Sequence, residues 1–541
     1  MPVVSHRHLL ILGVSVLVLL ITLSFPFNYD QTIFMIGGEK IVLHGGIPFR
    51  DVLDTKPLMI MYLYGFSSAL FGHSMVSIRV VDLLFQLTSL FFVYRITIRI
   101  FKNEEIAPWA VTLYSLLYVS FDYTATSQAE TFALLPALYI IDVVTKAIDK
   151  REVDDIIRTS VLTALASVFI LLLKTSLAVI PISLLGFLLF KKGISNHIRF
   201  VVTLVIFSLI LLGGFIYYLH VSGALENMMS VFSWLSDYSG AKDADIHTTV
   251  SNWALLELPK NFTMVYSFTT LILLGMGIYL SLKELRTASY STDWSDRSYI
   301  YLFIIVFAVS FSSIVFERKF FGYSFTRLLA SSFPFIILPM IGAIKRFNGF
   351  RRIERTSPIT QRWPRTLMLT AMVSLILFFS PIYSVADRGI RRIFLALNAE
   401  DVLADLKTTD RFNTIADQRD LSDTLKTFIK KDDTVFIWGN HIGPYYFLSK
   451  TPPTFITTSV MLISPWASTR WKNQMMNELR KNIPTYFLAE QYDYVDIISG
   501  YKLDSFRGMQ EFEDFYTFIR DNYDSITTTH NFSIYSRKQR L

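Results

Sequence analysis

The sequence predicts a polytopic α-helical membrane protein with a C-terminal α/β domain. Of its 541 residues, 52% are hydrophobic and only 18% are charged, whereas soluble domains are about 25% charged. Apolar runs long enough to cross a bilayer recur through residues 1–385, while residues 386–541 alternate short β-rich runs with polar helical stretches. This pattern argues against a soluble enzyme, a fibrous protein and a disordered chain.

The apolar runs predict about eleven transmembrane helices, since a spanning helix needs about 20 mostly apolar residues and fewer when it is buried. They lie near 9–27, 75–94, 106–120, 130–147, 159–173, 177–190, 199–221, 262–282, 299–316, 324–344 and 366–385. The first run follows a basic start but precedes no small-x-small cleavage site, so we interpret it as an uncleaved anchor.

The spans divide the chain into two predicted domains. Residues 1–385 form a transmembrane module with two long loops, 28–74 and 222–261. Residues 386–541 form a soluble α/β domain, with strands expected at 434–438, 485–488 and 532–535 and helices at 415–431 and 471–482.

The net charge of +7 belongs to the hydrophobic part of the chain. Residues 386–541 carry 20 basic and 20 acidic residues, so the excess lies in 1–385 and indicates membrane topology, not nucleic-acid binding. The chain has no cysteine, which excludes disulfides, thiolate zinc sites and cysteine nucleophiles. It also has no glycine-rich phosphate loop, which argues against a nucleotide-driven pump.

Basic residues in the loops predict the orientation. A cytoplasmic N-terminus places one strongly basic loop inside the cell and leaves residues 386–541 outside a plasma or inner membrane. The basic residues of that loop are Lys345, Arg346, Arg351, Arg352, Arg355, Arg362 and Arg365.

The first outside loop is rich in ionisable side chains, and Asp30 follows the first span directly. An ionisable group at a membrane boundary often has a function. Carboxylates and a lysine together suit a reaction that deprotonates a nucleophile and holds an anionic phosphate. A loop whose charges simply face water is the alternative for each single residue. The charged residues of the loop include Asp30, Arg50, Asp51, Asp54 and Lys56.

Further candidates lie along the chain. Glu130 opens the fourth span on the same side as Asp30, where it is expected to orient an acceptor, to pair with Lys174 or only to stabilise the helix dipole. Asp243 and Asp245 superficially resemble a metal-binding pair, but so short a pattern arises readily by chance. His44 and His247 are interpreted as plain loop histidines.

Several motifs in order resemble the GT-C glycosyltransferases, within them the family of protein O-mannosyltransferases and the lipid A aminoarabinose transferase. The N-terminal motifs are Asp30, Gly45-Gly46-Ile47-Pro48-Phe49-Arg50-Asp51, Lys56-Pro57, Leu70-Phe71-Gly72 and Arg79. The later ones are Ala129-Glu130-Thr131, Lys174, Arg318-Lys319-Phe320-Phe321-Gly322-Tyr323, Val435-Phe436-Ile437-Trp438-Gly439, Tyr446-Phe447-Leu448 and Pro452-Pro453-Thr454.

The resemblance implies transfer of a sugar from a polyprenyl-phosphate donor to a lipid, glycan or protein acceptor on the non-cytoplasmic face of the bilayer. It implies Asp30 as the general base on the acceptor and Lys56 as a contact of the donor phosphate, and we expect Arg50 to contact that phosphate too. Asp51, Asp54, Glu130, Lys174 and Tyr323 are candidate acceptor or active-site residues.

Two positions depart from the family pattern. Gln31 stands where relatives often carry a second acid, and Thr55 stands where they often carry Glu before the Lys-Pro pair. The sequence therefore does not support a divalent metal, and the cofactor is unknown. Two other functions stay open: a transporter or flippase of a lipid-linked saccharide, and an inactive relative that acts in assembly.

Overall fold

The computed structural model describes residues 6–191, 193–240, 256, 258–286, 294–317, 320–354, 385–397, 414–494 and 503–539. Most of the predicted span 366–385 lies outside these residues. So do Arg318, Lys319, Asp243, Asp245 and His247. The described chain is mostly helical and groups into two compact units. We call residues 1–25, 79–212 and 254–397 the helical unit, and residues 26–78, 213–253 and 398–541 the mixed unit.

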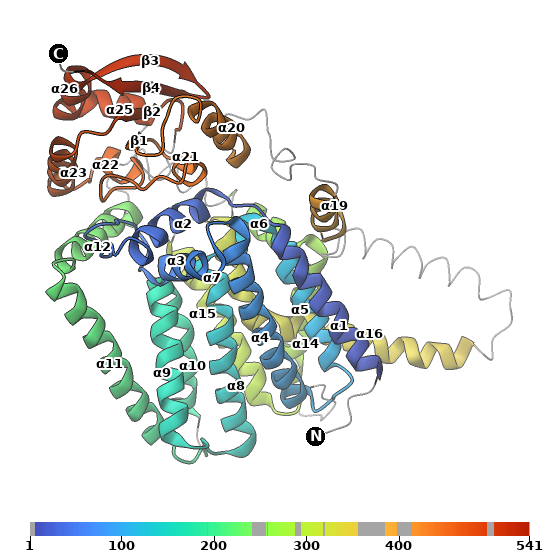
Figure 1. Cartoon of the computed structure of the whole chain (residues 1–541). Coiled ribbons are helices and arrows are strands. Elements are labelled where there is room, and N and C mark those ends of the chain that lie inside the picture. The colour runs from blue at the N-terminus through green and yellow to red at the C-terminus, as the bar shows by residue number, and fades with distance from the viewer. Residues whose placement is uncertain are drawn as a thin grey trace. The chain divides into compact units, whose positions relative to one another are not determined.

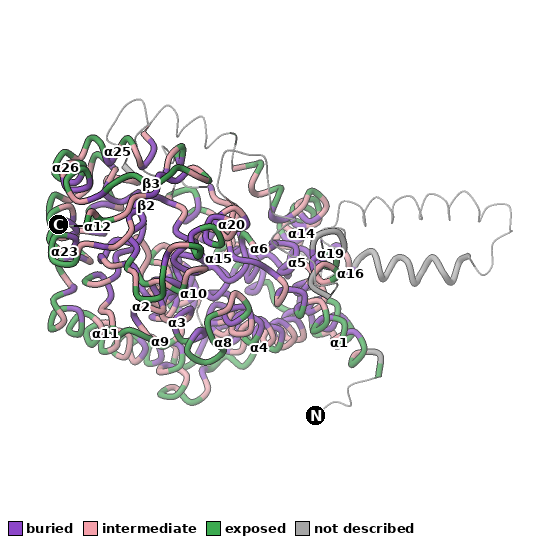
Figure 2. The backbone as a smooth tube through the Cα atoms, turned by 45° about the horizontal axis from the view of Figure 1, so that its top comes forward, coloured by how far each residue is buried: buried purple, intermediate pink, exposed green. Residues whose placement is uncertain are grey.

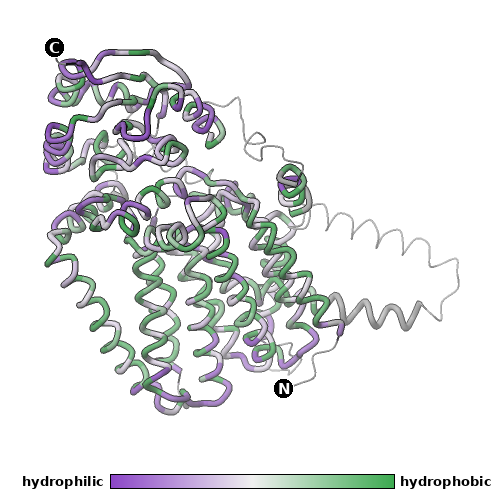
Figure 3. The backbone as a smooth tube through the Cα atoms, in the orientation of Figure 1, coloured by the Kyte–Doolittle hydropathy of each residue, from purple (hydrophilic) through white to green (hydrophobic). Residues whose placement is uncertain are grey.

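Seven described helices are long and apolar enough to cross a membrane, and an eighth crossing counts if a bent helix pair forms one span. The seven are Met75–Phe101, Ala129–Lys150, Ile156–Leu173, His197–Val221, Phe268–Arg286, Arg297–Glu317 and Gly322–Ile341. Figure 3 shows these helices as hydrophobic along most of their length. The chain is therefore a multi-pass membrane protein.

The helical unit is built from antiparallel and crossing helix pairs. In it α1 (His6–Leu20) packs on α5 (Ala107–Ser120), α8 (Leu134–Lys150) on α9 (Ile156–Leu173), and α10 (Val179–Phe190) on α15 (Arg297–Glu317). The pair α14 (Phe268–Arg286) and α16 (Leu329–Glu354) approaches closely at Gly277, where an added Cβ would lie 1.8 Å from the carbonyl oxygen of Phe335. Only glycine permits that crossing.

Burial varies strongly among the spanning helices, as Figure 2 shows. The segment Gly322–Ile341 is 94% buried within the protein, whereas α11 (His197–Val221) is only 17% buried. An apolar helix with so much exposed surface suits contact with lipid hydrocarbon. The difference separates the inner helices of the unit from its lipid-facing ones.

The mixed unit contains a four-stranded sheet of order β1-β2-β4-β3 (Figure 1). Strands β1 (Val435–Trp438) and β2 (Tyr486–Glu490) are parallel, with Val435 opposite Tyr486. Strands β4 (Phe532–Arg537) and β3 (Tyr523–Thr529) complete the sheet in antiparallel fashion. The three predicted strands are confirmed; β3 was missed because its sequence is largely polar and mostly exposed.

Helices pack around this sheet within the same unit. They are α20 (Ile415–Leu425), α21 (Gly443–Phe447), α22 (Val460–Ile463), α23 (Thr469–Lys481), α25 (Ser505–Glu511) and α26 (Glu513–Asn522). Helices α20 and α23 confirm the two predicted helices. Helix α12 (Leu225–Gly240) also belongs to the unit.

Helices α2 (Tyr29–Val42) and α3 (Met59–Phe71) of the mixed unit cross at two glycines. A Cβ on Gly38 would lie 2.3 Å from the carbonyl oxygen of Met61, and one on Gly65 would lie 2.3 Å from the carbonyl oxygen of Gly38. Helix α2 has 14 residues and is too short to cross a bilayer alone. The crossing fixes α2 against the chain that carries Lys56.

Candidate active site

The N-terminus of α2 carries Asp30 in its first turn. Asn28 caps the helix by accepting a hydrogen bond from the Gln31 backbone N–H at 3.0 Å, while the Gln31 side chain accepts one from the Asn28 N–H at 3.0 Å. This reciprocal cap satisfies two backbone donors at the helix start. Gln31, one of the departures from the family pattern, is fully buried and is therefore part of the structure that positions Asp30.

Asp30 and Lys56 form an ion pair. The Lys56 Nζ lies 3.4 Å from the Asp30 Oδ2, and their side chains are 13% and 19% exposed. The ammonium also lies over the Phe34 ring, 4.4 Å from its centroid, a favourable cation–π arrangement. A carboxylate and a cation are thus held together where a ligand can still reach both.

Asp54 holds the loop on which Lys56 stands. Its Oδ1 accepts a hydrogen bond from the Lys56 backbone N–H at 2.8 Å and from the Thr55 hydroxyl at 3.5 Å. Burial raises the pKa of Asp54, and Asp30 adds to the rise, although Lys56 opposes it. Asp54 thus acts on the geometry of Lys56 through the backbone.

A second polar cluster lies at the carboxyl ends of the two parallel strands. Glu490 ends β2 and accepts hydrogen bonds from the backbone N–H groups of Asn440 and His441, both at 2.9 Å. Its other oxygen lies 2.6 Å from the His441 Nδ1. Gly439 permits this approach, because a Cβ there would meet Glu490 at 2.6 Å.

The same cluster includes a second buried acid. Asp493 accepts hydrogen bonds from the Ser505 backbone N–H at 2.7 Å and from the Ser505 hydroxyl at 2.6 Å. Burial and then the Glu490 carboxylate raise its pKa. The His441 ring contacts the Tyr29 ring edge-on at 5.7 Å, so the cluster adjoins the residue next to Asp30.

Arg50 and Asp51 pair with each other. The guanidinium donates two hydrogen bonds to the Asp51 carboxylate, at 3.0 and 2.8 Å, and the Arg50 side chain is 47% exposed. The Arg50 carbonyl accepts a hydrogen bond from Gln474 of α23 at 3.2 Å. The loop is thereby held against α23.

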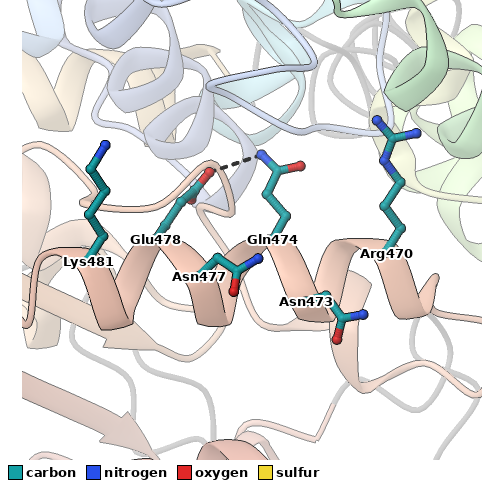
Figure 4. A pocket seen from close by; sticks show the side chains of 6 residues that line it. All are labelled: Arg470, Asn473, Gln474, Asn477, Glu478 and Lys481. Atoms are coloured by element: carbon teal, nitrogen blue, oxygen red, sulfur yellow. Dashed lines mark hydrogen bonds between the residues drawn. The ribbon is translucent and has the colours of Figure 1, made fainter.

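A polar groove of about 610 Å³ runs along α23. In Figure 4 four of its side chains leave the same side of the helix, and Gln474 donates a hydrogen bond to Glu478 at 3.0 Å. The four are Arg470, Gln474, Glu478 and Lys481. Glu478 also accepts a hydrogen bond from the Phe455 N–H at 2.8 Å, so it also holds the loop between α21 and α22.

The helical unit holds its own charged cluster. Lys174 lies 2.7 Å from Glu130 and 2.8 Å from Glu317, and Arg327 lies 3.0 Å from Glu130 and 2.7 Å from Glu317. Lys174 also lies over the Tyr323 ring, at 5.8 Å. The predicted pairing of Glu130 with Lys174 is confirmed, and the four side chains pair two acids with two cations.

The sequence analysis found some of these residues and missed others. Asp30, Asp54 and Lys56 come together in the mixed unit; Glu130, Lys174 and Tyr323 come together in the helical unit. Asn440, His441, Glu490, Asp493, Glu317 and Arg327 were not predicted. The cluster at the carboxyl ends of β1 and β2 could have been predicted from the polar residues that directly follow these two buried strands. Within the described residues, no group of three or more His, Asp or Glu could hold a metal ion.

Comparisons with known proteins agree with the resemblance inferred from the motifs. Residues 55–218 match the family model described as dolichyl-phosphate-mannose-protein mannosyltransferase. No curated protein matches the chain.

Several solved structures match the chain, and two of them are described here. The crystal structure of ArnT from Cupriavidus metallidurans bound to undecaprenyl phosphate has 11% sequence identity and a TM-score of 0.55, covering 98% of this chain and 97% of that one. The oligosaccharyltransferase AglB from Archaeoglobus fulgidus, in complex with an inhibitory peptide and a dolichol-phosphate, has 11% identity and covers 99% of this chain and 74% of that one. Its TM-score of 0.46 is too low to support an argument. The ArnT match shows that the chain has the GT-C fold, and the family model makes residues 55–218 similar to the protein mannosyltransferases.

Proposed function

We propose that the protein transfers a sugar from a polyprenyl-phosphate donor to a hydroxyl of its acceptor. The ion pair between Asp30 and Lys56 carries the proposal, because it places a proton acceptor beside a cation suited to phosphate. The matched family is described by a dolichyl-phosphate-linked sugar, and the ArnT structure holds undecaprenyl phosphate; both are polyprenyl phosphates.

In this reaction the acceptor oxygen attacks the anomeric carbon of the donor sugar while the bond to the phosphate breaks. Asp30 takes the proton that the acceptor hydroxyl loses. Lys56 stabilises the negative charge that grows on the departing phosphate, so its effect is larger in the transition state than in the bound donor.

The surrounding charges favour a hydroxyl acceptor over a phosphate acceptor. Asp30, Asp54 and Glu490 lie in the mixed unit around this region, and Lys56 and His441 are the cations described with them. Once the donor phosphate has engaged Lys56, an incoming phosphate would meet mostly carboxylates. A neutral or cationic acceptor avoids that repulsion.

The test is donor conversion by purified protein in detergent. Undecaprenyl-phosphate-linked mannose, glucose and arabinose, each radiolabelled, are offered separately with acceptors that carry hydroxyl groups. Release of undecaprenyl phosphate with formation of a labelled product supports the proposal. Absence of turnover with every donor and acceptor would contradict it and return attention to transport.

We propose that the site faces away from the cytoplasm, as the basic loop predicts. The native chain has no cysteine, so single cysteines report on topology cleanly. An impermeant maleimide added to intact cells should label a cysteine at Lys538, whose side chain is 40% exposed, and should not label one at Arg355. The reverse pattern would overturn the orientation.

A further inference from the structure

The imidazole of His441 is held through its Nδ1, and the side chain is 12% exposed. Its backbone N–H donates to Glu490 at 2.9 Å, and its Nδ1 lies 2.6 Å from the same carboxylate. Among the described residues, none hydrogen-bonds to Nε2. The Glu490 carboxylate is itself fixed by the Asn440 N–H at 2.9 Å. The ring therefore has one orientation and one nitrogen available to a ligand.

His441 stands where ligands commonly bind in α/β folds. Strand β1 ends at Trp438 and strand β2 ends at Glu490, so His441 lies at the carboxyl ends of two neighbouring parallel strands. Ligands of α/β sheets bind in the crevice outside these ends. Here Tyr29, the neighbour of Asp30 on α2, contacts the imidazole at 5.7 Å between ring centroids.

The charge on His441 is set by the groups that face it. Burial is the largest single influence and lowers its pKa, but the carboxylates of Glu490, Asp493 and Asp417 together outweigh burial, so the pKa is raised above 6.5. The Nε2 is thus protonated over more of the neutral range than in a free histidine. The phenol of Tyr29 also stays protonated, because burial raises its pKa and Asp30 raises it further.

We propose that His441 binds the acceptor, with Nε2–H donating a hydrogen bond to an acceptor oxygen while Glu490 holds the ring. The acceptor it fits is a hydroxyl-bearing compound without a negative charge, such as a saccharide or a serine-containing peptide. The Glu490 and Asp30 carboxylates would repel a phosphate, and a polarised N–H suits hydroxyl oxygens. This inference rests on the proposed glycosyl transfer.

The first test separates the acceptor from the donor. Purified full-length protein is assayed with the active lipid-linked sugar for transfer to a methyl glycoside, to a serine-containing peptide and to a phosphorylated lipid, and for donor hydrolysis without acceptor. His441→Phe should raise the acceptor KM by roughly 10- to 100-fold, the effect of losing a charge-assisted hydrogen bond. The donor KM and the acceptor-free hydrolysis should stay within about twofold of wild type.

Two further variants guard against a merely structural effect. His441→Gln keeps an N–H donor and should recover part of the acceptor affinity. His530→Gln alters a histidine in the turn between β3 and β4 and should change neither constant. If His441→Phe fails to fold, as judged by gel filtration, the comparison of His441→Gln with His530→Gln carries the test.

The second test uses pH. In the wild type the acceptor KM should rise as pH increases through the raised pKa of His441, because Nε2 then loses its proton. Glu490→Gln removes the group that raises this pKa, so the rise should begin at lower pH. If His441 only stabilised the fold, Glu490→Gln would not shift the pH at which the acceptor KM begins to rise.

The outcomes are distinguishable. If the wild type turns over no lipid-linked sugar, the proposed function fails and this inference falls with it. Two results in a wild type that transfers sugar would overturn only the role of His441. In the first, His441→Phe leaves the acceptor KM unchanged. In the second, His441→Phe lowers acceptor-free hydrolysis of the donor as much as it lowers transfer to the acceptor. Preferential transfer to the phosphorylated lipid would overturn the acceptor class.

Discussion

The two charged clusters of the protein differ in how completely their charges satisfy each other. In the helical unit, Glu130, Lys174, Glu317 and Arg327 pair two acids with two cations, and Glu130 and Arg327 are fully buried. In the mixed unit, Asp30 and Lys56 form one ion pair, with side chains 19% and 13% exposed, close to the 17% and 15% of Lys174 and Glu317. We call the first cluster closed, because each of its charges contacts two opposite charges, and we call the Asp30–Lys56 pair the open cluster. The closed cluster holds helices together, whereas the open cluster is the candidate to act on a ligand.

The largest effect is expected from Asp30→Asn, which tests the open cluster. If Asp30 is the general base, turnover should fall by about 10²–10⁴-fold, while the melting temperature and donor binding change little. Asn keeps the size of the side chain and an oxygen for Lys56. Steady-state transfer rates and thermal melts check both parts, and activity within a few-fold of wild type would move the role to Asp51 or Asp54.

A change in the closed cluster should affect stability first. Glu130→Gln leaves Lys174 and Arg327 with one carboxylate, and an uncompensated buried charge costs about 3–5 kcal/mol. Thermal melts in detergent measure the loss. The double variant with Lys174→Gln removes a cation together with the acid and should recover much of it; a double variant as unstable as the sum of both single changes would contradict the pairing.

Lys56→Met should lower turnover by roughly 10²-fold, as for loss of one group that stabilises transition-state charge. Donor affinity should fall less than turnover, because the charge on the phosphate grows as the bond breaks. Lys56→Arg should recover only part of the rate, since a planar guanidinium does not replace a compact ammonium. An unchanged rate in Lys56→Met would mean that the lysine only anchors the loop.

The smallest effect is expected from Asp54→Asn, which separates loop geometry from charge. Burial raises the pKa of Asp54, so its ionisation opposes folding, and stability present at low pH is lost as pH rises through this pKa. Asn keeps the oxygen that accepts from the Lys56 N–H. The variant should melt slightly higher than wild type at pH 7 and equally at pH values below 4; a lower melting temperature at pH 7 would show that the charge itself is needed.

The sequence by itself determined the architecture of the protein. Apolar runs predicted all seven described helices that are long enough to span, because lipid requires long helices whose backbone groups bond internally. Two further predicted spans, 106–120 and 177–190, are the shorter helices Ala107–Ser120 and Val179–Phe190. Alternating β-rich and polar runs predicted three of the four strands, and motif order predicted the GT-C fold. The sequence also singled out Asp30 and Lys56 as candidates, because both stand next to recognisable boundaries, and their catalytic roles stay a prediction.

Only the tertiary structure decided which polar residues meet. Glu317 lies 143 positions from Lys174, and Glu490 lies 49 positions from His441, so no local pattern connects them. Gln31 differed from the family pattern in sequence, yet in the folded chain it closes the cap that holds Asp30. The periodicity of a sequence indicates which face of a helix or strand is buried. The partners of a buried charge depend instead on how distant elements cross. In this protein such crossings occur at Gly38 and Gly65 and at the ends of β1 and β2.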